Sequence, residues 1–369
     1  MNLVCSRSVL STALSIVSGV VPSRTPQEIL KNVKLTVRDG QATLMGTDQE
    51  VGIRYVITDI QSQSSGECLL PTQRVSQILR ELPEAEVSLQ VDDQQLRIRC
   101  GQSDFRLSVE DPALFPDVVE FRDQDYHIAS GSVLKQGIQR TIFSTDSEST
   151  RYALGGVLME LRKDGLTLAA TDGRRLAVYG GAATAHGRVT EEVLAPVIPA
   201  KAMTLIERSI QSGEQEVHIA VHANDVLVRS GNSTIYARLV EGRFPRYQDV
   251  IPNDFTRSVS FVTGPFLSAV KQAMIVTNDE SKGVDFLFES GVLTLKSSAS
   301  DVGTSSVQLP IAYDGEPLSV TFDPKFVAEF LRVLENSSQV TLHMVDENSA
   351  AVYKADDNYT YVVMPLARD

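Results

Sequence analysis

The chain has 369 residues, of which 42% are hydrophobic and 22% charged, and its formal net charge is −13. This length predicts two or three domains, and the composition is ordinary for a globular protein. The sequence contains no apolar run near the ~18 residues that a membrane span needs, and its acidity excludes a uniformly basic nucleic-acid-binding surface. Positive charge confined to one face is still compatible with this composition.

Two features of the sequence bear on the cellular compartment. Residues 1–21 contain an apolar stretch, but Arg7 and several serines interrupt it, and no basic segment precedes it. We therefore predict an amphipathic helix rather than a signal peptide, and a cytoplasmic location. The cysteines Cys5, Cys68 and Cys100 are odd in number and widely spaced, so neither a disulfide framework nor a zinc site is expected.

Four kinds of segment recur three times, in the same order along the chain. The first is an amphipathic helix with apolar residues three and four positions apart, which occurs as RSVLSTALSIVSG, GSVLKQGIQRTIF and GPFLSAVKQAMIV. The second is a hairpin of two alternating strands around Gly40, Gly165 and Gly291. Glycine at these places predicts the positive φ that a tight hairpin turn demands.

The third kind of segment is a second amphipathic helix, which reads PTQRVSQILRELP, PAKAMTLIERSI and DPKFVAEFLRVLE in the three copies. The fourth is a second hairpin, in which polar and apolar residues alternate again. Each copy is thus expected to consist of two β-α-β-β halves, and the long repeat indicates tandem α+β domains. The predicted domains are residues 1–123, 124–253 and 254–369.

Three segments carry a resemblance to a known family. Residues 171–177 read TDGRRLA, residues 241–252 read EGRFPRYQDVIP, and residues 361–366 read YVVMPL. They are similar to the T-D-G-x-R-L-A motif, the D-G-R-F-P-x-Y-x-x-V-L-P segment and the Y-V-V-M-P-M terminus of the bacterial sliding clamp, the β subunit of DNA polymerase III. The resemblance covers the whole chain in order, including the threefold repeat.

The resemblance implies three DNA-clamp domains per chain, with helices lining the inside and antiparallel sheets forming the outside of a ring. Two chains would close this ring head to tail around double-stranded DNA, whose sequence it would not read. The implied function is that of a processivity factor, without catalytic activity, cofactor or metal. The implied partners are a second copy of the chain, the DNA polymerase III alpha subunit, the clamp-loader complex and other proteins with a clamp-binding motif.

In that family, partner proteins insert a short peptide into a cleft between the second and third domains. The residues of this chain that match the cleft are Leu154, Thr171, Gly173, Arg175, Leu176, Pro245, Val250, Val362, Met364, Pro365 and Leu366. Aliphatic, methionine and proline side chains make an apolar pocket, which suits an extended linear motif. Asp249 and the ending at residues 367–369 depart from the family pattern and indicate a different peptide preference.

The resemblance also implies a DNA-facing surface and a dimer interface. The predicted helices and their flanks carry the basic residues Arg7, Arg24, Arg74, Arg80, Lys135, Arg140, Lys201, Arg208, Lys271, Lys325 and Arg332. Of these, Arg24, Arg74 and Lys201 are expected to face DNA, together with Arg151 and Tyr152. The dimer interface is expected to place Phe105 of one chain against Ile275 and Val276 of the other.

Enzyme motifs are not found in the sequence. The histidines show no metal-ligand spacing, and there is no nucleophile elbow or phosphate-binding glycine loop. The pairs Thr47-Asp48 and Thr171-Asp172 each follow a hairpin strand, which favours Asx hydrogen bonds in a turn over a catalytic site. The competing hypotheses are a DNA-encircling clamp and a divergent clamp paralogue or acidic scaffold that does not encircle DNA, with a metal-dependent hydrolase a distant third.

Overall fold

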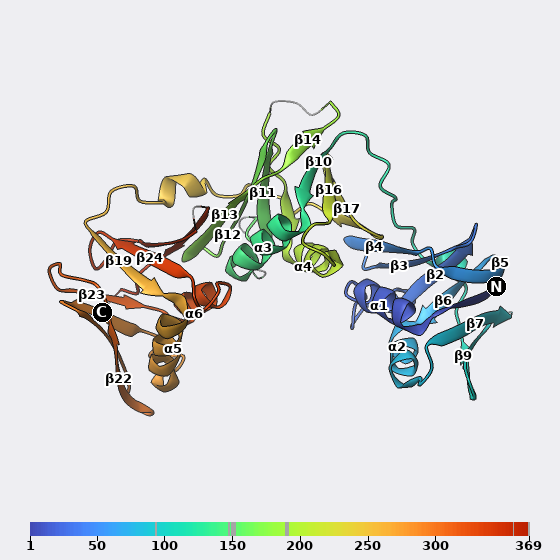
Figure 1. Ribbon diagram of the computed structural model, residues 1–369, viewed down its shortest axis with the longest axis horizontal. Helices are drawn as coiled ribbons and strands as arrows, with labels where there is room; N and C mark the ends of the chain where they lie inside the picture. Colours follow the sequence, from blue (N-terminus) through green and yellow to red (C-terminus); the bar gives the residue numbers. More distant parts are fainter. Residues whose placement is uncertain (93, 147, 149–152, 189–191, 357, 368–369) are drawn as a thin grey trace. The chain divides into compact units, whose positions relative to one another are not determined.

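The computed structural model describes residues 1–92, 94–146, 148, 153–188, 192–356 and 358–367. The chain divides into two compact units. The first unit contains Met1–Lys135, Arg162–Asp164 and Ala182–Val240, and the second contains Gln136–Leu161, Gly165–Gly181 and Glu241–Asp369. Figure 1 labels the α-helices (α) and many of the strands (β) of both units; η denotes a 3₁₀ helix.

The first unit is built on two antiparallel sheets. Its elements from the first sequence copy are β1 (Asn2–Ser6), α1 (Arg7–Val17), η1 (Glu28–Lys31), β2 (Asn32–Arg38), β3 (Gln41–Thr47), β4 (Val51–Ile57), β5 (Ile60–Ser64), β6 (Gly66–Pro71), α2 (Thr72–Glu81), β7 (Glu86–Asp92), β8 (Gln95–Cys100), β9 (Ser103–Ser108) and η2 (Pro112–Leu114). Those from the second copy are β10 (Tyr126–Ser130), β14 (Thr184–His186), β15 (Val197–Pro199), α4 (Ala200–Ser209), β16 (Glu216–Val221), β17 (Asp225–Ser230) and β18 (Ser233–Arg238). The strand orders are β5-β1-β7-β8-β9 and β14-β10-β16-β17-β18-β4-β3-β2-β6.

Helix α1 covers the first unit's sheets with the apolar face that the sequence predicts. Leu10, Leu14 and Val17 are fully or almost fully buried, and the helix contacts α2, β3 and β4. Gly46 on β3 permits this close approach, because a Cβ at that position would lie 2.9 Å from Cγ1 of Val17. The packing of α1 thus depends on a strand residue without a side chain.

The second unit repeats this plan. Its elements are η3 (Ile142–Ser144), β11 (Gly156–Arg162), β12 (Gly165–Thr171), β13 (Arg175–Gly181), η4 (Tyr247–Val250), β19 (Arg257–Val262), α5 (Thr263–Ala273), η5 (Met274–Val276), β20 (Val284–Glu289), β21 (Val292–Ala299), β22 (Gly303–Pro310), β23 (Leu318–Phe322), α6 (Pro324–Arg332), β24 (Gln339–Met344), β25 (Ala351–Ala355) and β26 (Tyr359–Val363). Strands follow one another in the orders β11-β12-β13-β26-β25-β24-β19 and β22-β21-β20-β23. Helix α3 (Gly131–Thr141) includes residues assigned to both units.

Aromatic residues fill much of the second unit's core. Phe330 of α6 is fully buried, and its ring stacks on that of Tyr361 with a centroid separation of 4.8 Å. Phe266 of α5 is also fully buried and meets the ring of Phe286 edge to face. Helices α5 and α6 contact each other as well as the sheets. Among the helices of the described residues, none is long and apolar enough to cross a membrane.

Each half of a sequence copy has a strand after its hairpin that the predicted β-α-β-β order lacks, and the first halves of copies one and two also contain β5 and β14. In the first copy, β4 follows the hairpin β2–β3, and β9 follows β7–β8; the corresponding later strands are β13, β18, β22 and β26. Two pairs of these strands join consecutive copies, because β4 pairs with β18 and β13 pairs with β26. The additional strands therefore make the sheets continuous across copies within each unit.

The prediction of positive φ is wrong for one of the hairpin glycines. Gly40 and Gly291 have φ values of 74° and 75°, as a tight turn requires. Gly165 does not have positive φ, and it is already the first residue of β12. Residues 163–164 form that turn, so the sequence alignment of the three hairpins is shifted by one position at the second turn.

Candidate functional site

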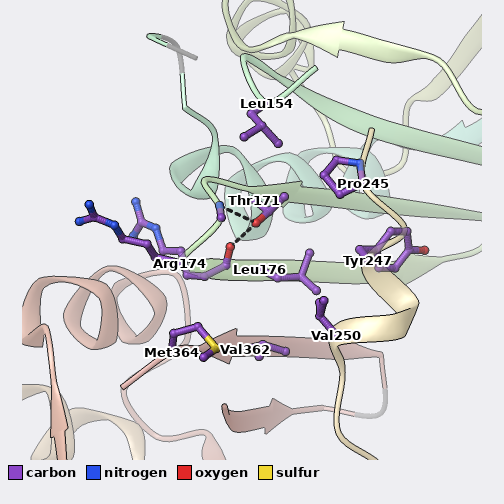
Figure 2. A pocket seen from close by; sticks show the side chains of 11 residues that line it. Leu154, Thr171, Arg174, Leu176, Pro245, Tyr247, Val250, Val362 and Met364 are labelled. Atoms are coloured by element: carbon purple, nitrogen blue, oxygen red, sulfur yellow. Dashed lines mark hydrogen bonds between the residues drawn. The ribbon is translucent and has the colours of Figure 1, made fainter. Parts of the chain in front are cut away.

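An apolar pocket opens on the surface of the second unit (Figure 2). Its volume is about 280 Å³, and its lining residues are Leu154, Thr171, Gly173, Arg174, Arg175, Leu176, Pro245, Tyr247, Val250, Val362 and Met364. Val250 and Met364 expose 57% and 45% of their surface, which is high for large apolar side chains beside a concave site. Such exposure commonly marks a binding surface.

Pairing between β13 and β26 brings the walls of the pocket together. Leu176 stands opposite Val362 in the register of these strands, although 186 residues separate them in sequence. Beyond the last pair, the amide of Met364 donates a hydrogen bond of 2.9 Å to the carbonyl oxygen of Arg174. Pro245, Tyr247 and Val250 close the pocket from the segment that contains η4.

A hydrogen-bonded turn between β12 and β13 shapes the rim of the pocket (Figure 2). The Thr171 hydroxyl donates to the carbonyl oxygen of Arg175 at 2.6 Å and accepts from the amide of Gly173 at 3.0 Å. Asp172 Oδ1 accepts from the amides of Arg174 and Arg175, at 2.9 and 3.1 Å. The Asx hydrogen bonds predicted for this pair are present, and the φ of 86° at Gly173 explains why glycine follows it.

Arg175 is a buried cation whose charge is compensated inside the protein. Its guanidinium bonds to Asp172 at 2.9 Å and to the Glu329 carboxylate, and it lies 4.3 Å from the centre of the Phe326 ring. Burial opposes the charged form, but the neighbouring Tyr361, Glu329 and Asp172 raise the pKa of Arg175 above its ordinary value. Arg175 therefore fixes the turn against α6 and offers little free charge to a ligand.

Tyr247 forms part of the pocket wall and is anchored from behind. Its hydroxyl donates a 3.1 Å hydrogen bond to the Glu160 carboxylate, and the Gln248 amide donates to the same carboxylate at 3.4 Å. Glu160 is buried on β11. These bonds hold η4, and with it the exposed Val250, against the sheet.

The structure brings all but two of the predicted cleft residues to this pocket. Pro365 and Leu366 do not line it. The amide of Leu366 bonds to the carbonyl oxygen of Thr321 on β23 at 2.8 Å, so the chain turns away along that strand. Arg174 and Tyr247 line the pocket but are absent from the predicted set, although Tyr247 lies within a motif that the sequence reveals.

The equivalent turn in the first unit has the same hydrogen bonds. Thr47 donates to the carbonyl oxygen of Val51 at 2.8 Å, and Asp48 Oδ1 accepts from the amides of Glu50 and Val51 at 3.0 and 2.8 Å. The two turns are therefore built alike, and the Asx prediction is confirmed at both.

The space beside the first-unit turn is filled, however, by the protein itself. Gly52 takes the place of Leu176, and a Cβ there would lie 3.0 Å from Cγ1 of Val118. Val118 is buried in a cluster with Met45, Leu69 and Phe115. Gly52 leaves room for Val118 to fill this space in the first unit. The two turns therefore have the same hydrogen bonds, but only the turn of the second unit borders an open pocket.

The residues predicted to face DNA differ in their surroundings. Arg24 and Arg74 are exposed. Lys201 is instead bonded through Nζ to the carbonyl oxygen of Val20 at 3.0 Å and to the Asp48 carboxylate. Arg151 and Tyr152 lie outside the described residues. The DNA-facing assignment stays a prediction for all of them.

Two other basic residues of the predicted helices are bound within the protein. Arg7 donates to the carbonyl oxygens of Glu84 and Leu79, both at 3.0 Å, and so satisfies groups at and after the end of α2. Arg140 is buried and bonds to Asp356 at 2.7 Å. Neither guanidinium is free to form part of a basic surface.

The predicted dimer contacts lie on separate units and are partly exposed. Phe105 belongs to β9, the last strand of its sheet, and exposes 37% of its surface. Ile275 in η5 exposes 75%, and Val276 beside it is half-buried. An exposed strand edge and exposed apolar side chains are typical of a protein interface, but the pairing of these residues stays a prediction.

The described residues contain no group of three or more histidine, cysteine or acidic side chains arranged to hold a metal ion. Cys5, Cys68 and Cys100 are all free and buried. Burial raises the pKa of the Cys5 and Cys68 thiols to about 12, so neither is a ready nucleophile at neutral pH.

Family models match the chain in three consecutive pieces. They are the N-terminal domain of the DNA polymerase III beta subunit at residues 1–119, its central domain at residues 129–246 and its C-terminal domain at residues 248–367. Among curated relatives, the beta sliding clamp of Synechococcus elongatus is 28% identical over 375 residues and covers 99% of each chain. The beta sliding clamp of Escherichia coli is 27% identical over 373 residues, covering 99% of this chain and all of the relative.

Solved structures show the same likeness. The DNA polymerase III subunit beta from Pseudomonas aeruginosa superposes with a TM-score of 0.90 at 27% identity, over the full length of both chains. A sliding clamp from the same organism, bound to griselimycin, gives a TM-score of 0.91 at 27% identity and the same coverage.

Proposed function

The chain belongs to the DNA polymerase III beta subunit family, and on this premise we propose that it is a DNA sliding clamp. In this role it encircles duplex DNA in the cytoplasm and tethers the replicative polymerase and other DNA-processing proteins. It acts by holding its partners in place, without catalysis of its own. Topological enclosure needs only weak phosphate contacts that are independent of base sequence.

The observation that carries this proposal is the apolar pocket of the second unit. Its walls consist mainly of aliphatic side chains around Leu176 and Val362, and the exposed Val250 and Met364 stand at its edge. A pocket of about 280 Å³ suits a few anchoring side chains of an extended segment rather than a folded domain. The polymerase alpha subunit and the clamp loader are proposed to compete for this pocket on a given chain, because one pocket can hold one segment at a time.

Ring formation is the second element of the proposal. Three clamp domains, at residues 1–123, 124–253 and 254–369, would combine with those of a second chain arranged head to tail. Phe105 would then pack against Ile275 and Val276 of the other copy, and burial of these exposed side chains would stabilise the ring. Light scattering tests this step, since a protein that stays monomeric at micromolar concentration contradicts the closed ring.

The DNA-facing surface is proposed to include Arg24, Arg74, Arg151, Tyr152 and Lys201. Lys201 is expected to contribute least, because its ammonium group is already bonded to Asp48. The alternative function is a divergent clamp or acidic scaffold that does not hold DNA, with which this pairing and the net charge of −13 are also compatible. A measurement of DNA affinity at several salt concentrations discriminates between the two functions, because only the sliding clamp is expected to bind DNA in a salt-dependent way.

Polymerase stimulation tests the proposed function. Primer extension by the cognate polymerase and clamp loader should yield longer products per binding event when the protein is present. A Met364→Glu variant should lose the effect, because binding of an apolar anchor would have to desolvate the new carboxylate. Products of unchanged length with the wild-type protein would contradict the clamp function.

A further inference from the structure

The linker between the first and second sequence copies, residues 115–125, is fastened to both copies within the first unit. Its first part lies on the first copy, where Val118 is buried and its carbonyl oxygen accepts a 2.8 Å hydrogen bond from Arg54. Its second part contains Phe121 and Asp123, and both side chains contact residues of the second copy. The contacts of this second part are made by two histidines and their neighbours.

Phe121 packs against His218 on β16 and Arg229 on β17. The centres of the Phe121 and His218 rings are 6.2 Å apart, and the guanidinium carbon of Arg229 lies 4.8 Å from the centre of the Phe121 ring. His218 and Arg229 stand opposite each other in the register of their strands, and Arg229 Nη2 donates a 2.6 Å hydrogen bond to His218 Nδ1. Tyr126 stacks on the His218 ring, with 4.7 Å between the ring centres. The phenyl ring is thus held by an arginine that His218 positions.

The hydrogen bond from Arg229 requires a neutral His218. Nδ1 accepts only while it carries no proton, so the hydrogen of the ring is on Nε2, which faces Glu216 Oε2 at 3.5 Å. Protonation would place a hydrogen on Nδ1, break the bond and leave two cations side by side. Burial is the largest cause of the lowered pKa of His218; Arg229 and His186 add to it, and Glu216 opposes it. A fall in pH therefore releases Arg229, and with it the contact on Phe121.

His222, in the turn between β16 and β17, holds the linker in the opposite protonation state. Its Nε2 atom lies 2.9 Å from Asp123 Oδ1, and its Nδ1 atom lies 2.6 Å from Asp225 Oδ1. Ionised carboxylates only accept hydrogen bonds, so both ring nitrogens donate and the ring is positively charged. The bonds to Asp225 and Asp123 raise the pKa of His222, whereas Arg238, opposite Asp225 on β18, is paired with Glu50. A rise in pH leaves a neutral ring that can donate to only one of the two carboxylates.

We propose that His218 and His222 form a latch on the linker, in which one ring must be neutral and the other charged. His218 stabilises the closed latch fully above the ordinary histidine pKa of 6.5, and less as the pH falls below it. His222 stabilises the closed latch fully below that value, and less as the pH rises above it. The latch is therefore strongest near about pH 6.5 and weakens on both sides, whereas a single histidine would give a change in one direction.

Opening of the latch should have a local effect. The pairing of β4 with β18 joins the two copies in one sheet and does not involve either histidine. The hydrogen bond from Arg54 to Val118 is likewise independent of both rings. An open latch therefore frees the second part of the linker without separating the copies or unfolding them.

Tryptophan fluorescence tests the proposal, because the chain contains no tryptophan and Phe121→Trp supplies a single reporter. An indole ring keeps the contact with Arg229, since tryptophan is the best aromatic partner for a cation. Time-resolved anisotropy measures the fraction of these rings that moves freely on the nanosecond timescale. This free fraction should be smallest near about pH 6.5 and rise about two- to fivefold toward about pH 5 and about pH 8.5, as for partly exposed ion pairs.

Further substitutions in the reporter protein assign the two rises. His218→Asn retains an acceptor for Arg229 without a titrating group, so the rise in acid should disappear and the rise in alkali remain. His222→Gln cannot be charged, so the free fraction should already be high near about pH 6.5 and stay constant in alkali. His343→Gln is the matched control and should keep both rises, because burial also lowers the pKa of His343 but this residue lies in the second unit.

Titration of the unmodified chain is an independent check, since the reporter itself replaces a residue that the latch holds. NMR spectra of protein with isotope-labelled histidine should show His218 titrating below the ordinary histidine pKa and His222 above it. A free fraction that does not depend on pH, a rise in acid that survives His218→Asn, or two histidines that titrate together would overturn the inference. These measurements use neither DNA nor a partner protein, so their outcome is separate from that of the proposed function.

Discussion

The ammonium group of Lys201 on α4 is bonded to the carboxylate of Asp48, which lies in the turn between β3 and β4. The same group donates to the carbonyl oxygen of Val20. Lys201 thus links the second sequence copy to two segments of the first. A residue that would be expected to serve DNA binding is, in this structure, also part of the packing within the first unit.

This dual position of Lys201 gives a first prediction. Lys201→Gln should lower the free energy of unfolding by about 0.2–1 kcal/mol, the range of partly exposed ion pairs, as measured by urea denaturation. Arg24→Gln should leave stability unchanged and reduce the salt slope of DNA affinity by about 1, because it removes one phosphate contact. If Lys201→Gln reduces the slope as strongly as Arg24→Gln without affecting stability, the ion pair with Asp48 is unimportant in solution.

A second prediction concerns the exposed apolar edge of the pocket. Val250→Glu should weaken binding of a partner segment at least about tenfold, because its carboxylate would be desolvated in an apolar site. Thermal stability should change little, since 57% of the Val250 surface is exposed. Surface plasmon resonance with the polymerase alpha subunit measures the first effect, and calorimetry the second. Unchanged partner affinity would place the binding site elsewhere.

Removal of the C-terminal residues is a less specific test of the same pocket. The amides of Met364 and Leu366 bond to the carbonyl oxygens of Arg174 and Thr321. Deletion from residue 364 onward would break both hydrogen bonds as well as the pocket wall. Loss of polymerase stimulation in such a truncation is expected, but only the point substitutions separate binding from packing.

A third prediction tests the close packing of α1 on β3. Gly46→Ala should destabilise the protein by about 1–3 kcal/mol, because the added Cβ meets Val17 and Val20 in a filled core. Gly180→Ala is the matched control, since its Cβ would lie 3.8 Å from the nearest atom. Chemical denaturation measures both. Equal effects of the two substitutions would show that backbone entropy, rather than the contact with α1, determines the cost.

A fourth prediction follows from a buried histidine. His127 on β10 is 2% exposed, its Nε2 atom has no hydrogen-bond partner, and burial lowers its pKa. Above the unfolded-state pKa of about 6.5 both states are neutral, so His127 contributes no pH dependence there. As the pH falls below that value, the unfolded state takes up a proton that the folded state resists, and stability declines until the pH reaches the lowered folded-state pKa.

Urea denaturation at pH 7.5 and pH 5.5 measures this effect. The wild type should lose more stability between the two pH values than a His127→Gln variant does. His222 acts in the opposite sense, because hydrogen bonds to Asp225 and Asp123 raise its pKa and stabilise the fold on protonation. The comparison is therefore made between the two proteins, which share His222. An identical pH dependence in both would rule out His127 as its source.

Much of the fold could be predicted from the sequence, because amphipathic periods and turn residues are local signals. The helix positions and the hairpins around Gly40 and Gly291 follow from these signals. The third strand of each half was missed. Strands β9 and β22 lie at sheet edges, and β4, β13, β18 and β26 each pair on one side with a strand from another copy, a long-range pairing that local periodicity does not reveal. Gly165 shows that one glycine can mark either a turn or the strand after it.

The candidate site was predictable only through the family resemblance. Leu154, Leu176 and Val362 are apolar residues that periodicity alone would assign to the core. In the first unit, Val118 fills the space beside the equivalent turn, whereas no described side chain fills the pocket of the second unit. Whether a side chain fills such a space is decided by tertiary packing, which local sequence patterns do not show. Arg140 shows the opposite error. Its place on an amphipathic helix indicated an exposed basic residue, but the structure buries it in an ion pair with Asp356.

Release from DNA ends tests the central claim most directly. The protein is loaded by the cognate clamp loader onto a nicked circular plasmid, separated from free protein by gel filtration, and the plasmid is then cut once with a restriction enzyme. A sliding clamp should stay on the circle and leave the linear molecule, because only topology holds it. Equal retention on circular and linear DNA, or no retention on the circle, would contradict the account.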